Sequence, residues 1–222
     1  VIESRGLGDV YKRQDIMSTT YSTDIVNAYV VGFPASLLDR HKFPGEAMDV
    51  FYGDWRDLTA MRLNDSAIVN ISFTHNYEPA TRTLTVDIAA DFIADASGDF
   101  RFNCYVVEDS ITGGSQYNQS SYFNNTPGHP LNGQGNPIVG YVHNHVVRDM
   151  LGGAWGTDGI VPATVMNGDN ITHQYVTALD NAIDENQVKL VVFMQRYDAD
   201  EEARDIMNAT QMKMEVPTAT SV

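Results

Sequence analysis

The sequence predicts a mainly β protein, an antiparallel β-sandwich or jelly-roll-like domain, over the larger part of the chain. After residue 64 apolar and polar residues alternate strictly, as in Val69-Asn70-Ile71-Ser72-Phe73, which is typical of strands with one buried face. Seven such segments are separated by turn signals, and no convincing helix interrupts them. The strands are expected at residues 69–73, 84–88, 100–107, 141–148, 173–179, 188–197 and 205–216.

We therefore expect one sandwich domain over residues 65–216, followed by a short tail at residues 217–222. Its core should be built from the apolar face of each strand, because a slip of one residue would expose the whole set. The expected core residues are Val69, Phe73, Val86, Phe102, Cys104, Val106, Val191 and Phe193. Cys104 is the single cysteine, so no disulfide forms within the chain, and a buried, inert thiol is expected.

The segment before the sandwich has a different pattern. Residues 46–63 are expected to form a helix, because apolar residues recur at helical spacing after the break at Pro44-Gly45. These apolar residues are Phe51, Trp55, Leu58 and Met61. Upstream, Pro34 lies in an apolar run, where proline favours the start or the edge of a strand.

The first fourteen residues are expected to be foreign to the protein. Ser4 to Gln14 reads as a translated transposase-type sequencing adapter, whose mosaic-end codons GAT GTG TAT AAG AGA CAG encode residues 9–14. Such a segment is excluded from fold reasoning. We expect it to be coil or a stray helix that packs against nothing, including Val10 and Tyr11, with Asp15 inside a longer reading frame. A natural basic arm is the alternative reading.

Charge excludes one class of partner. The chain has 14 basic and 29 acidic side chains, a net charge of −15. Phosphate binding needs clustered Lys and Arg, so no nucleic acid partner is expected. No apolar run approaches the roughly eighteen residues of a membrane helix, so membrane contact is expected only through an anchor outside the sequence.

An uncharged segment is the first candidate for a binding site. Residues 111–147 contain no Asp, Glu, Lys or Arg and are rich in Asn, Gly, Gln and Tyr. Tyr117, Tyr122 and Phe123 supply aromatic surfaces, and the amides supply donors and acceptors, a combination suited to sugar or peptide recognition. A surface loop packed by its own aromatic side chains is the alternative.

A histidine pair is the second candidate. His143 and His145 are two residues apart on a predicted strand, so both should lie on one face, near the Glu108-Asp109 end of the preceding strand. Two imidazoles so spaced can ligate zinc if Asp109, Glu108 or His129 adds a third ligand. A structural, hydrogen-bonded role explains the pair equally well. The acidic run from Asp198 to Glu202 lacks the spacing of a calcium loop and is interpreted as a solvated turn.

The segments that carry a family resemblance are Glu108-Asp109-Ser110-Ile111, Gln116-Tyr117, the stretch GYVHNHVVRDM at residues 140–150, Trp155-Gly156, Val191-Val192-Phe193 and Asn208-Ala209. Together they resemble the C-terminal β domain of the Bacteroidetes outer membrane protein 28 family. The resemblance covers residues 15–215, and HNHVVRDM is its most specific part. It implies a lipoprotein or secreted protein of the cell envelope, associated with the outer membrane.

The same resemblance implies that residues 15–64 are the C-terminal part of a thioredoxin-like α/β domain. Gly32-Phe33-Pro34 resembles the turn before the strand whose proline is cis, which would make Phe33 a substrate-contact position. The Cys-x-x-Cys of such domains is absent from these residues, so we assign no catalytic residue and no cofactor.

Two classes of function follow. In the first, which we favour, the chain is an envelope-associated or secreted binding or adhesion-type protein for a peptide, glycan or protein ligand. In the second, it is an accessory domain of a thiol-disulfide oxidoreductase whose Cys-x-x-Cys lies upstream. Fold alone does not decide between them.

Overall fold

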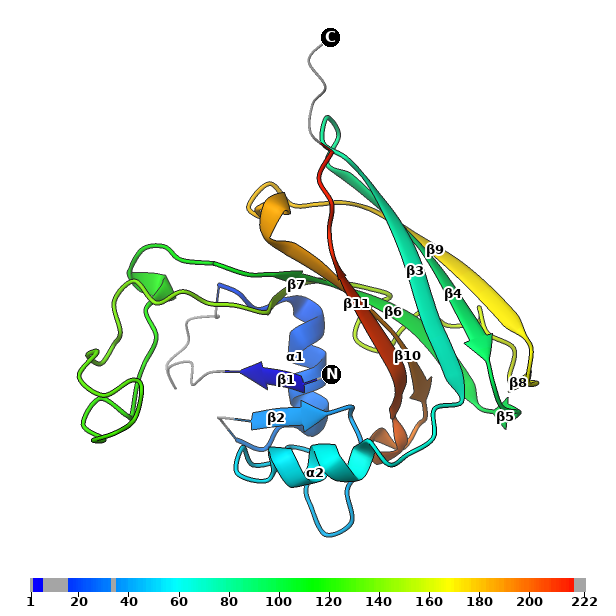
Figure 1. Cartoon of the computed structure of the whole chain (residues 1–222), viewed down its shortest axis with the longest axis horizontal. Coiled ribbons are helices and arrows are strands. Elements are labelled where there is room, and N and C mark those ends of the chain that lie inside the picture. The colour runs from blue at the N-terminus through cyan, green and yellow to red at the C-terminus, as the bar shows by residue number, and fades with distance from the viewer. Residues whose placement is uncertain (1, 6–15, 33–34, 218–222) are drawn as a thin grey trace.

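A computed structural model describes residues 2–5, 16–32 and 35–217, and its main feature is two antiparallel sheets packed face to face (Figure 1). One sheet has the order β11-β10-β6-β7 and the other the order β3-β4-β9. Their strands are β3 (Val69–Glu78), β4 (Thr83–Phe92), β6 (Asp99–Glu108), β7 (Val146–Leu151), β9 (Asn170–Ala178), β10 (Val188–Tyr197) and β11 (Ile206–Lys213). A small pair, β5 (Ala96–Ser97) and β8 (Thr164–Val165), extends one end. The predicted mainly β fold is confirmed.

The space between the two sheets holds the main hydrophobic core. Six of the expected core residues pack there, namely Val69, Phe73, Val86, Phe102, Cys104 and Val106. Burial alternates along the strands of the three-stranded sheet as the sequence pattern requires, for example with Leu84, Val86 and Ile88 of β4 buried. The predicted alternation therefore identifies correctly which face of these strands points toward the core.

Two expected core residues lie on the wrong face. Val191 and Phe193 of β10 point away from the sandwich core, which takes Leu190 and Val192 instead. β10 is apolar on both faces because its sheet is covered on both sides, so alternation alone does not reveal which face is internal. Phe193 is nevertheless fully buried, with Tyr105 at a ring-centroid distance of 4.9 Å.

The outer cover of this sheet is the segment before residue 64. It contains α1 (Thr20–Tyr29), β2 (Ala35–Leu38) and α2 (Trp55–Arg62), and Ile25 and Tyr29 of α1 pack in one cluster with Phe193. α1 was not predicted from the sequence, although Thr19 and Ser22 form a reciprocal capping box at its start.

The helix expected over residues 46–63 is shorter than predicted. α2 begins only at Trp55, because Val50 forms an antiparallel bridge with Ser36 and the residues on either side of it form turns and bends instead of a helix. Phe51 and Met61, two of the four apolar residues behind that prediction, are exposed. Within α2 the buried residue is Leu58.

The expectation that residues 1–14 pack against nothing is wrong for Ile2–Arg5. This strand, β1, pairs antiparallel with β2, from Ile2 opposite Leu38 to Arg5 opposite Ala35. Backbone hydrogen bonding does not depend on side-chain identity, so the open edge of β2 pairs with any extended segment within reach. Val10 and Tyr11 lie outside the described residues.

Arg40 joins the cover to the sandwich. Its side chain is 1% exposed and donates hydrogen bonds to the carbonyl oxygen of Ala154 at 2.9 Å and to Gln195 Oε1 at 2.7 Å. A further hydrogen bond reaches the hydroxyl of Tyr105 at 2.5 Å. The backbone at Asp39 and Arg40 is left-handed, with φ of 51° and 49°, an uncommon conformation for these residues that this packing maintains.

Candidate functional site

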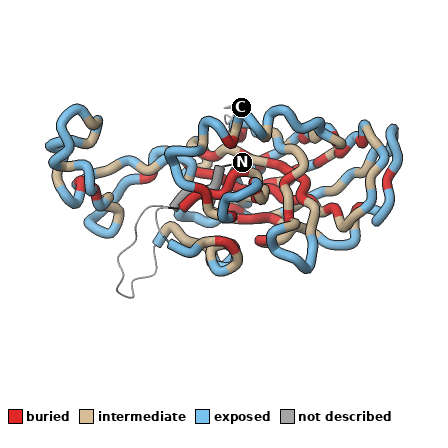
Figure 2. The backbone as a smooth tube through the Cα atoms, turned by 90° about the horizontal axis from the view of Figure 1, so that it is seen from below, coloured by how far each residue is buried: buried red, intermediate tan, exposed pale blue. Residues whose placement is uncertain are grey.

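The uncharged segment forms an arm that projects from the body of the molecule between β6 and β7 (Figure 1). We call residues 111–147 the arm. Antiparallel bridges join Ile111 to His143 and Gln119 to Ile138, so the two halves run back along each other. Figure 2 shows that buried positions concentrate in the body and that most of the arm is exposed. The arm therefore presents far more surface than a tight loop between two strands would.

Inside the arm, asparagine side chains accept hydrogen bonds from backbone amides that would pair with a neighbouring strand in a regular sheet. Asn124 Oδ1 accepts a hydrogen bond from the amide of Gly135 at 2.6 Å, and Asn136 Oδ1 accepts one from the amide of Ser121 at 3.1 Å. Irregular backbone has donors that need partners, and the amide oxygen supplies them. Part of the Asn-rich composition is thus structural rather than available to a ligand.

The three aromatic candidates of the arm differ in exposure. Tyr122 is 76% exposed and Phe123 is 40% exposed, whereas Tyr117 is half-buried beside a short 3₁₀ turn, Ser115–Tyr117. Phe123 stacks on His129 at a centroid distance of 4.0 Å, which orients its ring. Tyr122 and Phe123 are therefore the aromatic surfaces that the arm offers to a ligand.

The two candidate histidines are not on one strand face. β7 begins at Val146, and His145 has a left-handed backbone with φ of 59°, so strand alternation does not apply to it. His143 Nε2 lies 2.7 Å from the carbonyl oxygen of Tyr117 and so holds the arm's own backbone. The strand predicted over residues 141–148 is wrong in its first half, because residues 141–145 belong to the arm.

The expected contact with the Glu108-Asp109 end is made by His145. Asp109 Oδ1 lies 3.0 Å from His145 Nδ1 and accepts a hydrogen bond from the amide of His145 at 2.8 Å, while Asp109 Oδ2 lies 2.6 Å from Lys189 Nζ. Glu108 points elsewhere, toward Arg148 and the amide of Asp184. These contacts close the base of the arm.

A metal site is not assembled here. Across residues 2–5, 16–32 and 35–217, no three His, Cys, Asp or Glu side chains are grouped to hold an ion. His129, considered as a third ligand, accepts a hydrogen bond from the amide of Leu131 at 3.1 Å and stacks on Phe123. His143 and Asp109 are each engaged in the protein contacts described above.

Asp109 makes the arm base sensitive to pH. Partial burial acts to raise the pKa of Asp109, but the hydrogen bonds from Lys189 and from the backbone of His145 outweigh it, and the pKa is lowered. A carboxyl group whose pKa is lower in the folded protein than in the unfolded chain stabilises the folded state at pH values above its pKa in the unfolded chain. That contribution is lost as the pH falls through the folded pKa.

We predict that the amide of His145 loses protection from hydrogen exchange, relative to its intrinsic exchange rate, as the pH falls from about 6 to about 3. The reason is that protonated Asp109 is a weaker acceptor. In Asp109→Ala the protection should already be low at pH 6 and independent of pH. Unchanged protection in that variant would show that Asp109 does not close the arm base.

The redox-adjacent candidates, Phe33 and Pro34, lie outside the described residues. The single thiol, Cys104, is fully buried, and this burial, with a further contribution from the charge of Asp149, raises its pKa to about 12. It is therefore protonated and inaccessible at neutral pH, as an inert core thiol should be.

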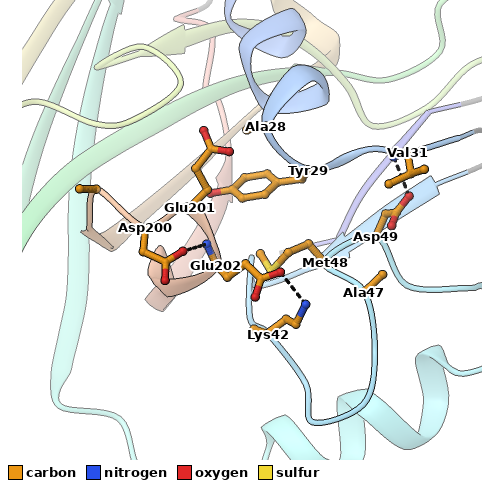
Figure 3. A pocket seen from close by; sticks show the side chains of 11 residues that line it. Ala28, Tyr29, Val31, Lys42, Ala47, Met48, Asp49, Asp200, Glu201 and Glu202 are labelled. Carbon is orange, nitrogen blue, oxygen red and sulfur yellow. Dashed lines mark hydrogen bonds and ion pairs between the residues drawn. The ribbon is translucent and has the colours of Figure 1, made fainter.

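A pocket that was not predicted from the sequence lies between the cover and the β10–β11 turn (Figure 3). Its volume is about 600 Å³. Its lining comprises Ala28, Tyr29, Val31, Lys42, Ala47, Met48, Asp49, Ala199, Asp200, Glu201 and Glu202. The acidic run predicted as a solvated turn forms one wall. Because the lining comes from three segments distant in sequence, no local pattern could have indicated it.

The carboxylates of this pocket already have partners within the protein. Glu202 Oε1 lies 2.6 Å from Lys42 Nζ, Asp49 Oδ2 accepts a hydrogen bond from the amide of Val31, and Asp200 Oδ1 accepts one from the amide of Glu202. Through these contacts the acidic side chains stabilise the β10–β11 turn and the cover. The pocket is a cavity without an evident catalytic group.

Fold and candidate sites together define a two-layer β-sandwich protein with an α/β cover and a projecting, uncharged arm. A family model described as outer membrane protein Omp28 matches residues 23–217. The chain belongs to this family and is a protein of the cell envelope. No curated protein sequence matches the chain. No helix of the described ranges is long and apolar enough to cross a membrane.

Among solved structures, the chain is similar to HBP35 of Porphyromonas gingivalis, with a TM-score of 0.63 and 17% identity over 91% of this chain. It spans 60% of the length of that protein's chain, and the likeness concerns the fold alone. A domain of the outer membrane lipoprotein Omp28 from Porphyromonas gingivalis has 12% identity and a TM-score of 0.37, covering 68% of this chain and 90% of that one. A structural-genomics protein of Agrobacterium tumefaciens has 12% identity and a TM-score of 0.49, covering 93% and 77%.

Proposed function

We propose that this chain is a binding protein of the cell envelope and that the arm contacts the ligand. The observation that carries the proposal is the contrast in charge. A chain of net charge −15 projects a long segment without any Asp, Glu, Lys or Arg, and Tyr122 at 76% exposure lies on it. Exposed aromatic side chains on loops beside a rigid scaffold are typical of recognition sites.

The ligand class that fits this arm is a neutral glycan. Planar aromatic rings pack on sugar faces, and Asn, Gln and Ser side chains hydrogen-bond to hydroxyl groups without requiring charge on the ligand. Part of the amide set is occupied internally, as at Asn124 and Asn136, so specificity would come from the donors and acceptors of the arm that remain outside these contacts. An anchor outside the chain would hold the protein at the membrane.

The alternative role, as an accessory domain of a thiol-disulfide oxidoreductase, finds no support in the thiol of this chain. Cys104 is its single cysteine and is fully buried. Cys104 would therefore take no part in that chemistry, whose Cys-x-x-Cys would lie upstream, whereas the arm of this chain supports binding.

We predict that the double variant Tyr122→Ala/Phe123→Ala loses at least about tenfold in affinity for a neutral oligosaccharide bound by the unaltered chain, because stacking area is removed. The measurement is calorimetry against a panel of neutral and acidic oligosaccharides. Phe51→Ala, an exposed aromatic residue outside the arm, serves as the matched control and should bind normally. Absence of binding to every neutral member, or equal binding by the double variant, would refute the proposal.

A further inference from the structure

Strand β9 forms a free edge of the three-stranded sheet. Among the described residues it pairs with β4 alone, and Figure 1 shows it on the outer side of that sheet with no strand beyond it. An edge strand presents a row of backbone N–H and C=O groups without strand partners, which is a template for pairing with another chain.

Hydrogen bonds at both ends of β9 identify the residues that point outward. The carbonyl oxygen of Asp169 accepts from the amide of Phe92, and the amide of Leu179 donates to Arg82, both at 2.9 Å. Odd-numbered residues of the strand therefore direct their backbone groups toward β4. By alternation, five residues direct theirs away from the sheet. They are Asn170, Thr172, Gln174, Val176 and Ala178.

This edge lacks the features that normally prevent edge-to-edge pairing. β9 contains no Lys, Arg, Asp, Glu, Pro or Gly, and its pairing with β4 runs without a register shift. The outer strands of the other sheet differ, because β7 carries Arg148 and Asp149, β11 carries Lys213, and both pair irregularly.

The remaining outer strand, β3, is contacted by β11 and by the segment that follows it. Asn208 Nδ2 donates to the carbonyl oxygen of Val69 at 2.7 Å, and the amide of Glu215 donates to His75 Nε2 at 2.9 Å. Of the outer strands of the two main sheets, β9 is thus the one that is long, regular and uncharged.

We propose that β9 pairs antiparallel with β9 of a second copy of this chain, about a two-fold axis through Gln174. In this register Gln174 lies opposite its own copy, Thr172 opposite Val176 of the other copy, and Asn170 opposite Ala178. Every outward-pointing residue then donates one backbone hydrogen bond and accepts one, as hydrogen-bonded antiparallel pairs do. The contact is isologous, so it closes as a dimer.

The register places no like charges opposite each other, because β9 has none, and it pairs Thr172 with the β-branched Val176 on the outer face. Two carboxylates of β4 lie beside this edge, and Asp169 and Asp180 flank β9 in the chain. Asp87 and Asp91 already accept hydrogen bonds from Gln174 Nε2 at 2.7 Å and Asn170 Nδ2 at 2.6 Å. In this register Asp169 lies opposite Leu179 and Asp180 opposite Gly168 of the other copy, so no two carboxylates are directly opposite each other.

The dimer should be weak and should tighten with salt. Pairing through one edge buries less than the roughly 1,200 Å² of a standard stable interface. Each copy carries a net charge of −15, so repulsion between the bodies opposes pairing at low ionic strength and is screened at higher ionic strength.

Gln174→Lys tests the proposal because it places two like charges opposite each other at the two-fold axis. Its matched control is Thr74→Lys, since Thr74 and Gln174 flank the same Asp87 on the same sheet face and only Gln174 is on β9. Sedimentation equilibrium over a range of concentrations and salt should show a dimer for the unaltered chain and for Thr74→Lys. For Gln174→Lys the dissociation constant should rise at least about tenfold, because like charges directly opposite destabilise a strand pair.

Cross-linking provides a readout that does not depend on affinity. Residues of a hydrogen-bonded antiparallel pair have Cα atoms about 5.5 Å apart, within disulfide range. Oxidised Gln174→Cys should form covalent dimers and Thr74→Cys should not, and the buried Cys104 does not compete. A monomer at all concentrations, as expected if β9 pairs only with a foreign extended peptide, or equal cross-linking of both variants, would overturn the proposal.

Discussion

Replacing Arg40 by alanine should lower the free energy of unfolding by about 3–5 kcal/mol. The guanidinium donates to the carbonyl oxygen of Ala154, to Gln195 and to Tyr105 in the buried contact between the cover and the sandwich. Each buried acceptor left without a donor costs about 1–3 kcal/mol, and water entering the space offsets part of the sum. The cation also lies 5.5 Å from the ring of Trp155, a contact that is lost as well.

The measurement is equilibrium unfolding in urea, with Arg56→Ala as the control. Arg56 is exposed on α2, so its removal should change the free energy of unfolding by less than about 0.5 kcal/mol. If Arg40→Ala also costs less than about 1 kcal/mol, the buried contact does not hold the cover in place.

The second large effect is expected at Gly156. Its φ is 77°, and a methyl group there would lie 2.6 Å from Cβ of Arg101 and 2.8 Å from Oδ1 of Asn103. Asn103 cannot easily move, because it is fully buried and accepts a hydrogen bond from Gln195 Nε2 at 2.6 Å. Gly156→Ala should therefore cost about 2–5 kcal/mol, the sum of left-handed strain and overpacking.

Gly159 provides a matched control for the strain alone. Its φ of 76° is nearly the same, but nothing lies within 4 Å of the position of the added methyl group. Gly159→Ala should cost about 1–2 kcal/mol, the strain without the clash. Thermal or urea unfolding of both variants separates the two contributions. Equal losses would mean that the Arg101–Asn103 neighbourhood relaxes around the methyl group.

How far the fold is predictable from sequence depends on burial. β3 and β4 have one buried face and one exposed face, so their alternating pattern predicts both their position and their inward residues. β10 is covered on both sides, and the same reasoning located the strand but assigned Val191 and Phe193 to the wrong face. The helix predicted over residues 46–63 is longer than α2, because Phe51 has helical spacing but is exposed and lies outside the helix.

The candidate site was predictable in composition and not in geometry. The absence of charge in residues 111–147 identified the arm, and the proximity of Asp109 to His145 followed from the return of the chain at the arm base. The orientation of the histidines did not follow, because a left-handed residue at His145 interrupts the alternation on which the prediction rested. No local signal reveals such a residue, since its backbone amide is held by Asp109, far away in the sequence.

The sequence by itself determined the mainly β fold, the approximate positions of the seven strands in the two main sheets, the acidic character and the uncharged arm, because each of these depends on local periodicity or on composition. Tertiary structure alone decided which face of β10 meets the sandwich, where Arg40 finds its partners and that β9 is left as a free edge. The physical reason is that these features depend on contacts between segments far apart in the chain. Local pattern specifies a period along a strand, whereas neighbours from elsewhere in the fold specify what each face and edge will contact.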